Sequence, residues 1–192
     1  MQVILIEGRR KIPPEAHDQL RDVAAEMARA APDAIFRSGN AEGSDTAFAA
    51  GVVSVDPSRM QYVMPTPNMG KKRRHPDGRV YSLSELPQVE LDRLCELTIQ
   101  ATPKSERLAR AAAQGMSGPL AAKGRYLLRD TLKVVGSTAL ELAPATQAFF
   151  YVDLSAPQAG GTGHTIRVCN LSNLHVMFQD DFLIGDAGTP IP

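Results

Sequence analysis

Residues 34–51 read Ala-Ile-Phe-Arg-Ser-Gly-Asn-Ala-Glu-Gly-Ser-Asp-Thr-Ala-Phe-Ala-Ala-Gly, and this stretch decides how we interpret the chain. A short apolar run, Ala34–Phe36, leads into a loop with two glycines, and an alanine-rich helical pattern follows Ser44. We interpret these residues as a strand, a glycine loop and a helix N-terminus. Glycine lets a ligand approach the backbone closely, and a helix start presents unpaired N–H groups and a positive dipole end. The stretch therefore predicts a phosphate or carboxylate site, unless its Gly and Asp residues merely cap the helix.

Two further loops of this kind follow strand-like runs. Near the C-terminus, the apolar run Phe149–Val152 precedes residues 159–168, where three glycines occupy four positions and open a helix. At the start of the chain, Val3–Ile6 leads into Glu-Gly-Arg-Arg at residues 7–10. The carboxyl ends of parallel strands meet at one edge of a sheet, so three such loops predict a shared nucleotide site at that edge.

These loops resemble motifs of the SLOG superfamily, which groups DprA/Smf proteins with LOG-type enzymes. Gly-Arg-Arg at residues 8–10 is similar to its Gly-Ser-Arg strand end. Ser-Gly-Asn-Ala-Glu-Gly-Ser-Asp at residues 38–45 resembles the Ser-Gly-Gly-Ala-x-Gly-Ala-Asp signature of its small YspA-like branch, common in bacteria and phages. Gly-Gly-Thr-Gly at residues 160–163 is similar to the Gly-Gly-x-Gly loop of LOG enzymes. The resemblance covers most of the chain, with residues 60–130 matching poorly.

The resemblance and the alternation of strands with helices predict one fold class. We expect an α/β, Rossmann-like three-layer fold with a parallel sheet flanked by helices. We also expect a ligand site at the three loops. Its candidate residues are Gly8, Arg9, Arg10, Ser38, Gly39, Asn40, Ala41, Gly43, Ser44, Asp45, Gly160, Gly161, Thr162, Gly163, His164 and Thr165.

Length and composition suit a single domain over residues 1–192. Lysine plus arginine equals aspartate plus glutamate, 21 each, and aromatic residues make up only 5%, which argues against a nucleic-acid binder. Cys95 and Cys169 stand alone without metal-ligand spacing, so we expect reduced core residues of a cytoplasmic protein with no metal and no cofactor. No apolar run approaches the length of a membrane span, and no signal peptide is evident.

Residues 66–84 form the least regular segment and carry a Lys-Lys-Arg-Arg-His run at residues 71–75. They are interpreted either as a solvated loop or as a flexible basic flap over an anionic ligand. His75 is expected at the surface. The patterns predict strands at 2–7, 34–36, 60–64, 147–152 and 174–178, helices from Pro13 to Pro32, after Ser44 and over 162–171, a helical insertion at about 85–135 ending in a helix over Pro119–Val135, and a turn-rich tail over 180–192.

The helix over Pro119–Val135 carries Arg125, Arg129 and Lys133 in a cationic stripe. Such a stripe is ordinarily a solvated helix face. In YspA-like relatives a helix at this point carries an arginine toward the ligand, so the resemblance implies that Arg125 or Arg129 contacts the ligand here. We include Arg129 among the ligand-binding candidates.

This sequence lacks part of the motif that LOG enzymes use for catalysis. They cleave the N-glycosidic bond of nucleoside monophosphates and need the Glu of Gly-Gly-x-Gly-Thr-x-x-Glu. In this sequence His164 stands at the Thr position and Arg167 at the Glu position. A cation cannot accept a proton or stabilise an oxocarbenium ion, which weakens the hydrolase interpretation. Arg167 would suit a phosphate or lie at the surface, and His164 would serve as a proton donor or a phosphate contact.

Among the carboxylates near the loops, Glu42 is the first candidate for acid–base catalysis and Glu7 the second. Asp45 either caps its helix or contacts a ribose hydroxyl. The sequence therefore predicts binding, by sensing or sequestering, of a nucleotide-derived small molecule. The alternative is a nucleotide N-glycosidase or phosphoribohydrolase. LOG relatives are commonly dimers, and the leucine-rich segment 86–97 is a candidate interface for a homodimer.

Overall fold

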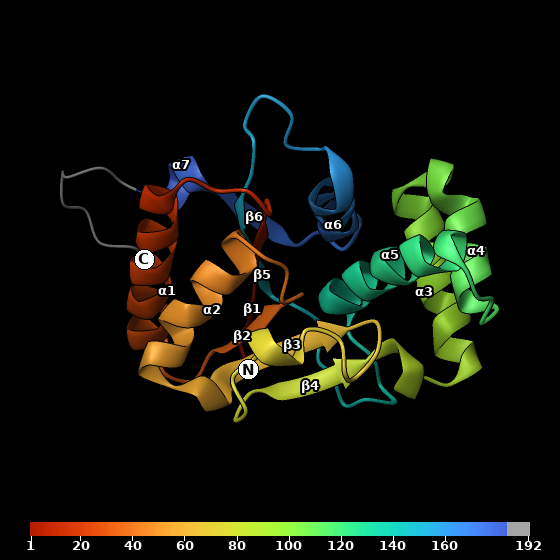
Figure 1. Ribbon diagram of the computed structural model, residues 1–192, viewed down its shortest axis with the longest axis horizontal. Coiled ribbons are helices and arrows are strands. Elements are labelled where there is room, and N and C mark those ends of the chain that lie inside the picture. The colour runs from red at the N-terminus through yellow and green to blue at the C-terminus, as the bar shows by residue number, and fades with distance from the viewer. Residues whose placement is uncertain (184–192) are drawn as a thin grey trace.

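The computed structural model describes residues 1–183 and has the α/β, Rossmann-like architecture that the sequence predicts. Parallel strands form one sheet, with helices on both faces (Figure 1). In chain order the helices and strands are β1 (Val3–Gly8), α1 (Pro14–Ala30), β2 (Ile35–Ser38), α2 (Ser44–Val55), β3 (Met60–Met64), β4 (Arg79–Ser82), α3 (Gln88–Ala101), α4 (Glu106–Ala113), α5 (Pro119–Val135), β5 (Gln147–Tyr151), α6 (Gly160–Leu171), β6 (His175–Phe178) and α7 (Gln179–Phe182).

The order of the strands places a topological switch point at β1. The sheet runs β4-β3-β2-β1-β5-β6, and every pairing is parallel. The chain builds outward from β1 through β2 to β4, then returns to the other side of β1 with β5. The loops that leave the carboxyl ends of β1, β2 and β5 consequently surround one point at this edge of the sheet. Ligands of open α/β sheets bind in the crevice at such a point.

Alternation along the strands supplies two separate cores. Ile4 and Ile6 of β1, with Phe36 of β2, face α1 and α2, whose own apolar residues repeat at helical spacing. Phe182 of α7 closes this core with its ring 5.5 Å from that of Phe149. The intervening residue of β1, Leu5, faces the opposite layer.

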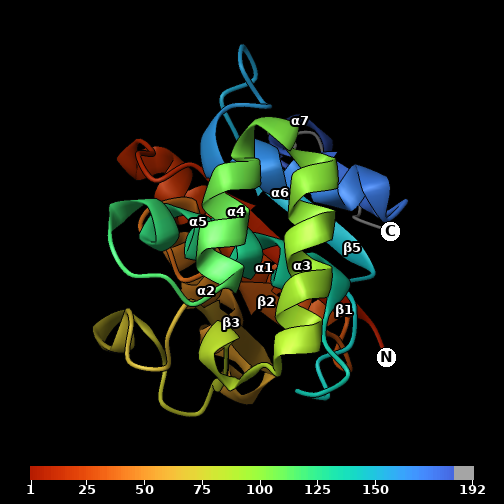
Figure 2. The same ribbon diagram turned by 90° about the vertical axis from the view of Figure 1, so that its right-hand side faces the viewer.

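The opposite layer consists of α3, α4, α5 and α6 (Figure 2). Helix α5 runs between the α3–α4 pair and α6, and it packs against both. In α3, Leu86 just before the helix and Leu94 within it are buried inside the chain, whereas Val89 is 72% exposed. Leu86 and Leu94 therefore belong to the internal core and Leu91 packs partly against it, while the homodimer stays a prediction.

The bounds of β3 and α5 agree with the sequence prediction, and two segments differ from it. Residues 66–84, expected to be irregular, include β4, an edge strand with Arg79 and Val80 exposed. The expected turn-rich tail begins with α7, and its remainder, 184–192, lies outside the described residues. Cys95 and Cys169 are buried and unpaired, as predicted.

Candidate functional site

The three loops predicted to share a site do converge. A hollow of about 270 Å³ opens at the carboxyl ends of β1, β2 and β5, between these loops and α5. It lies at the switch point of the sheet. Its lining residues are Glu7, Gly8, Arg10, Ala41, Asp45, Tyr126, Leu127, Arg129, Asp130, Ala159, Gly160, Gly161 and Thr162.

Asp45 ties two of the loops together at the base of the hollow. Its Oδ1 accepts a hydrogen bond from the Gly8 N–H (3.2 Å), and its Oδ2 accepts from the Ser38 hydroxyl (3.0 Å) and the Ala41 N–H (3.2 Å). Asp45 is 1% exposed and does not make the helix-capping bond that one interpretation gave it. The third loop joins β1 through the Thr162 hydroxyl, which donates to the Gly8 carbonyl (3.1 Å).

A second, smaller hollow of about 140 Å³ adjoins the first. The two share Arg10, Ala41, Tyr126 and Arg129, so they form neighbouring parts of one groove. The smaller part has both apolar and charged lining residues. The residues that line it alone are Gly39, Asn40, Glu42, Met64, Pro65, Met69 and Arg73.

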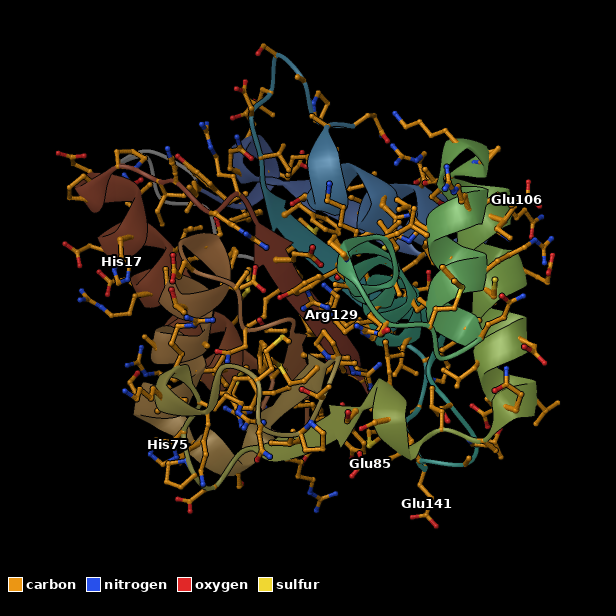
Figure 3. All side chains as sticks on the ribbon, turned by 45° about the vertical axis from the view of Figure 1, so that its right-hand side comes forward. His17, His75, Glu85, Glu106, Arg129 and Glu141 are labelled. Carbon is orange, nitrogen blue, oxygen red and sulfur yellow. The ribbon has the colours of Figure 1, made fainter. Side chains whose placement is uncertain are left out.

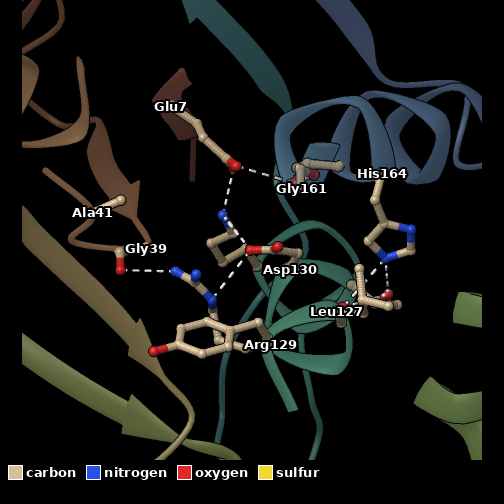
Figure 4. A network of polar contacts seen from close by, with 12 residues as sticks. Glu7, Gly39, Ala41, Leu127, Arg129, Asp130, Gly161 and His164 are labelled. Atoms are coloured by element: carbon tan, nitrogen blue, oxygen red, sulfur yellow. Dashed lines mark hydrogen bonds and ion pairs between the residues drawn. The ribbon is translucent and has the colours of Figure 1, made fainter. Parts of the chain in front are cut away.

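A buried network of charges forms the floor under both hollows (Figure 4). The Lys133 ammonium contacts Glu7 Oε2 and lies 2.9 Å from Asp130 Oδ1. Arg129 Nη1 donates to the Gly39 carbonyl (2.7 Å), and its Nε forms an ion pair with Asp130 Oδ1 at 3.1 Å. The Thr165 hydroxyl donates to Glu7 Oε1 at 3.1 Å. All these side chains are less than a tenth exposed, and Arg129 lies near the centre of the molecule (Figure 3).

The network sets the protonation states of its members. Burial raises the pKa of Glu7 to about 7, although the Lys133 charge opposes this shift. Burial would also raise the pKa of Asp130, but Arg129 and Lys133 outweigh it and hold that pKa below its ordinary value. Burial acts against the charge of Lys133, yet Asp130 and Glu7 together raise its pKa. Asp130 is therefore ionised at neutral pH, while Glu7 exchanges its proton there.

Glycine is required where the loops meet the network. A β-carbon at residue 39 would lie 1.7 Å from Arg129 Nη1, and one at residue 8 would lie 2.2 Å from the Tyr151 carbonyl oxygen. Neither glycine has a positive φ, so the requirement is for space. Gly39 thus admits the arginine that the resemblance placed near the ligand.

Several predicted site residues support the loops without lining either hollow. Ser38, Ser44, Gly163 and Thr165 are enclosed by protein. The Ser44 hydroxyl donates to the Arg9 carbonyl at 2.9 Å, and a β-carbon at residue 163 would collide with the Gln158 carbonyl oxygen at 1.9 Å. Gly43, with φ 81°, begins α2 against the Arg10 backbone.

Arg9, Glu42 and His75 do not line the larger hollow. The Arg9 guanidinium lies 4.0 Å from Asp153. Glu42 lines the smaller hollow only, with its side chain 73% exposed and 3.2 Å from Arg73. His75 lies at the periphery, as expected (Figure 3).

His164 and Arg167 line neither hollow, and the expected role of His164 as a proton donor or phosphate contact does not fit its position. His164 is 0% exposed: its Nδ1 pairs with the Thr102 hydroxyl at 2.8 Å, and burial lowers its pKa. It cannot donate a proton into the hollow from there. Arg167 is half-buried, and its Nε donates to the Ala101 carbonyl and the Thr102 hydroxyl, so it joins α6 to the end of α3.

Three residues of α5 at the site were missed as candidates by sequence reasoning: Tyr126, Asp130 and Lys133. With Arg129 they occupy positions i, i+3, i+4 and i+7, which is one face of a helix. The solvated-face interpretation is wrong for Arg129 and Lys133, which are 5% and 1% exposed. The signal in the sequence was Asp130, a carboxylate that lies between Arg129 and Lys133 on this helix face and can pair with both.

Searches of the chain against protein-family models, curated proteins and solved structures find no match. Membership of the SLOG superfamily thus remains a prediction from the three motifs. Within residues 1–183, no group of three or more His, Cys, Asp or Glu side chains is arranged to hold a metal ion. Over the same residues, no helix combines the length and apolar character that crossing a membrane requires.

Proposed function

We propose that this protein binds a nucleotide-derived small molecule, which it senses or sequesters, through the groove at the carboxyl edge of the sheet. The observation that carries the proposal is the convergence of residues from three separate loops on one hollow: Gly8 and Arg10, Ala41 and Asp45, and Gly160–Thr162. Backbone N–H groups at the start of α6 have no intrahelical partner, which suits a phosphate.

The charges at the hollow support an anionic group near its mouth. Arg10 is exposed and forms no ion pair within the described residues, so its guanidinium is available to a ligand. Arg129 is already fixed by Gly39 and Asp130. A phosphate at the start of α6 and beside Arg10 would gain charge-assisted hydrogen bonds, which are stronger than neutral ones.

The smaller hollow suits the base of such a ligand. Met64, Pro65 and Met69 contribute apolar surface beside the polar side chains of Asn40, Glu42 and Arg73. Tyr126 stands between the two hollows with its side chain partly exposed. Aromatic and methionine side chains pack well against flat heteroaromatic rings. The groove would thus hold a two-part ligand, with the phosphate over the larger hollow and the base in the smaller one.

Calorimetric titration with nucleoside monophosphates and ADP-ribose tests this proposal. We expect binding that weakens about tenfold in Arg10→Ala, because one charge-assisted hydrogen bond contributes about 1.5 kcal/mol or more. Lys11→Ala is the matched control, since Lys11 is an exposed neighbouring cation that lines neither hollow. If no nucleotide binds, or if both variants weaken binding equally, the proposal is wrong.

A second candidate, N-glycosidic hydrolysis of a nucleotide, is favoured by one observation. Glu7 lines the larger hollow, and burial raises its pKa to about 7, which suits a general acid. Release of free base from AMP, lost in Glu7→Gln and kept in Glu42→Gln, would establish hydrolysis. Binding without release of base would leave the protein a binding module.

We also propose a cytoplasmic location, which the unpaired cysteines support, since a reducing compartment keeps thiols free. The homodimer implied by the LOG resemblance is a further proposal. Sedimentation equilibrium at several protein concentrations tests it directly.

A further inference from the structure

Asp130 presents one carboxylate oxygen to the larger hollow. The ion pairs that it makes within residues 1–183 both go to Oδ1, from Arg129 Nε at 3.1 Å and from Lys133 Nζ at 2.9 Å. Oδ1 is sealed from solvent, whereas Oδ2 lies toward Gly161, which lines the same hollow. The residue as a whole is 4% exposed, so its position is fixed by the surrounding protein.

The available oxygen faces the glycine turn that begins α6. A β-carbon placed on Gly161 would lie 3.6 Å from Asp130 Oδ2 and would meet nothing nearer. Figure 4 shows Asp130 between Arg129 and this turn. The carboxylate oxygen and the start of α6 therefore border the same part of the larger hollow.

Resting on the proposed function, we infer that Asp130 Oδ2 accepts a hydrogen bond from a sugar hydroxyl of the ligand. The site would thus select ribose phosphates over deoxyribose phosphates, with Asp130 as a specificity-determining residue. An ionised carboxylate only accepts hydrogen bonds, so its partner must be a donor. Arg129 and Lys133 keep it ionised by lowering its pKa.

Other partners fit this oxygen less well. A phosphate oxygen would be repelled by the carboxylate and belongs instead near Arg10 and the α6 amides. A cationic group would face Arg129 and Lys133, both within 3.1 Å of the same carboxylate. The described residues also offer no metal-binding cluster. A neutral hydroxyl avoids both repulsions, and a nucleotide carries such hydroxyls a short distance from its phosphate.

The first test needs no variant. AMP, GMP, CMP and UMP are each titrated calorimetrically into the full chain beside their 2′-deoxy and 3′-deoxy counterparts. For the tightest binder, we expect at least one deoxy form to bind about 10- to 100-fold more weakly, the loss typical of a hydrogen bond to a charged group. If both deoxy forms bind within twofold of the parent, the inference is wrong while the proposed function stands. If no nucleotide binds, both are overturned.

The second test reverses the hydrogen-bonding character of Asp130. In Asp130→Asn, the amide oxygen can stay toward Arg129 and Lys133 while the amide N–H₂ faces the hollow. We expect the ribose preference to fall, because a hydrogen bond between the neutral amide and the hydroxyl is weaker than one to an ionised carboxylate, with affinity for the deoxy form unchanged. Asp22→Asn, on the exposed face of α1, is the control. Equal weakening of both sugars would indicate a purely structural role and overturn the inference, and a variant that does not fold leaves the wild-type comparison to decide.

Discussion

Replacing Glu7 by Gln is expected to change how the stability of the fold depends on pH. Glu7 is 6% exposed at the end of β1, and its carboxylate contacts Lys133 and the Thr165 hydroxyl. Burial raises its pKa from an ordinary 4.5 to about 7 despite the nearby ammonium. Gln has nearly the same shape and stays neutral, so the substitution removes this titration and little of the packing.

The sign and size of the effect follow from linkage. Because the pKa is higher in the folded state, folding favours the protonated carboxyl. This contribution is fully present below pH 4.5 and is lost as the pH rises through about 7. At about 1.4 kcal/mol per pKa unit, the whole loss is about 3 kcal/mol. Wild type should therefore lose about 2 to 3 kcal/mol relative to Glu7→Gln between pH 5 and pH 8.

Urea denaturation of both proteins at pH 5, 6, 7 and 8 measures this difference. Subtracting the two free energies of unfolding removes the contributions of other titrating groups that the two proteins share. Glu42→Gln is the matched control, because that side chain is 73% exposed, and it should show no such dependence. A difference between wild type and Glu7→Gln that stays constant over this range would refute the reasoning. It would mean that Glu7 is ionised over this whole pH range, because the charge of Lys133 offsets the effect of burial on the pKa of Glu7.

Three other substitutions or reagents test the site. Gly39→Ala should lower the free energy of unfolding in urea by about 1–3 kcal/mol, because its β-carbon would lie 1.7 Å from Arg129 Nη1, whereas Gly161→Ala should unfold like wild type. Lys133→Met should cost about 3–5 kcal/mol at pH 8 by leaving buried carboxylates unpaired, and less at pH 5; an equal cost at both would contradict the protonation of Glu7. Burial raises the pKa of Cys169 to about 12, so thiol labelling should follow unfolding, and rapid labelling of the native protein would show that Cys169 is accessible.

The layout of the fold was predictable because its signals are local. β3 is a run of five residues buried over its whole length, and α5 starts with Pro119 at a position where proline is favoured. The alternation of strands and helices then left a parallel sheet as the natural arrangement. β4 was missed because it is a four-residue edge strand in which Arg79 and Ser82 leave only two apolar residues, close to a basic run.

The charged network was not predictable from the same local signals. Arg129 and Lys133 look like a solvated stripe until Glu7 is brought against them from β1, 126 residues away. His164 shows the same problem. Its glycine neighbours suggested exposure, but Thr102 and the Leu127 carbonyl enclose it from two other helical segments. Burial of a polar residue depends on partners distant in the chain, which a window of sequence does not contain.

Under the proposed function, the position of Arg129 would make the network matter for binding as well as for stability. Its guanidinium is held by the Gly39 carbonyl and by Asp130, and it lies 5.7 Å from the centre of the Tyr126 ring. An arginine on a flexible surface would lose about 0.5–1.5 kcal/mol of side-chain entropy when it bound a ligand. Here that loss occurs on folding, so a ligand meets a side chain already in place. Asp130 and the Gly39 carbonyl therefore orient Arg129, the buried cation that lines both hollows, and the ion pair of Lys133 with Asp130 supports that carboxylate from beneath.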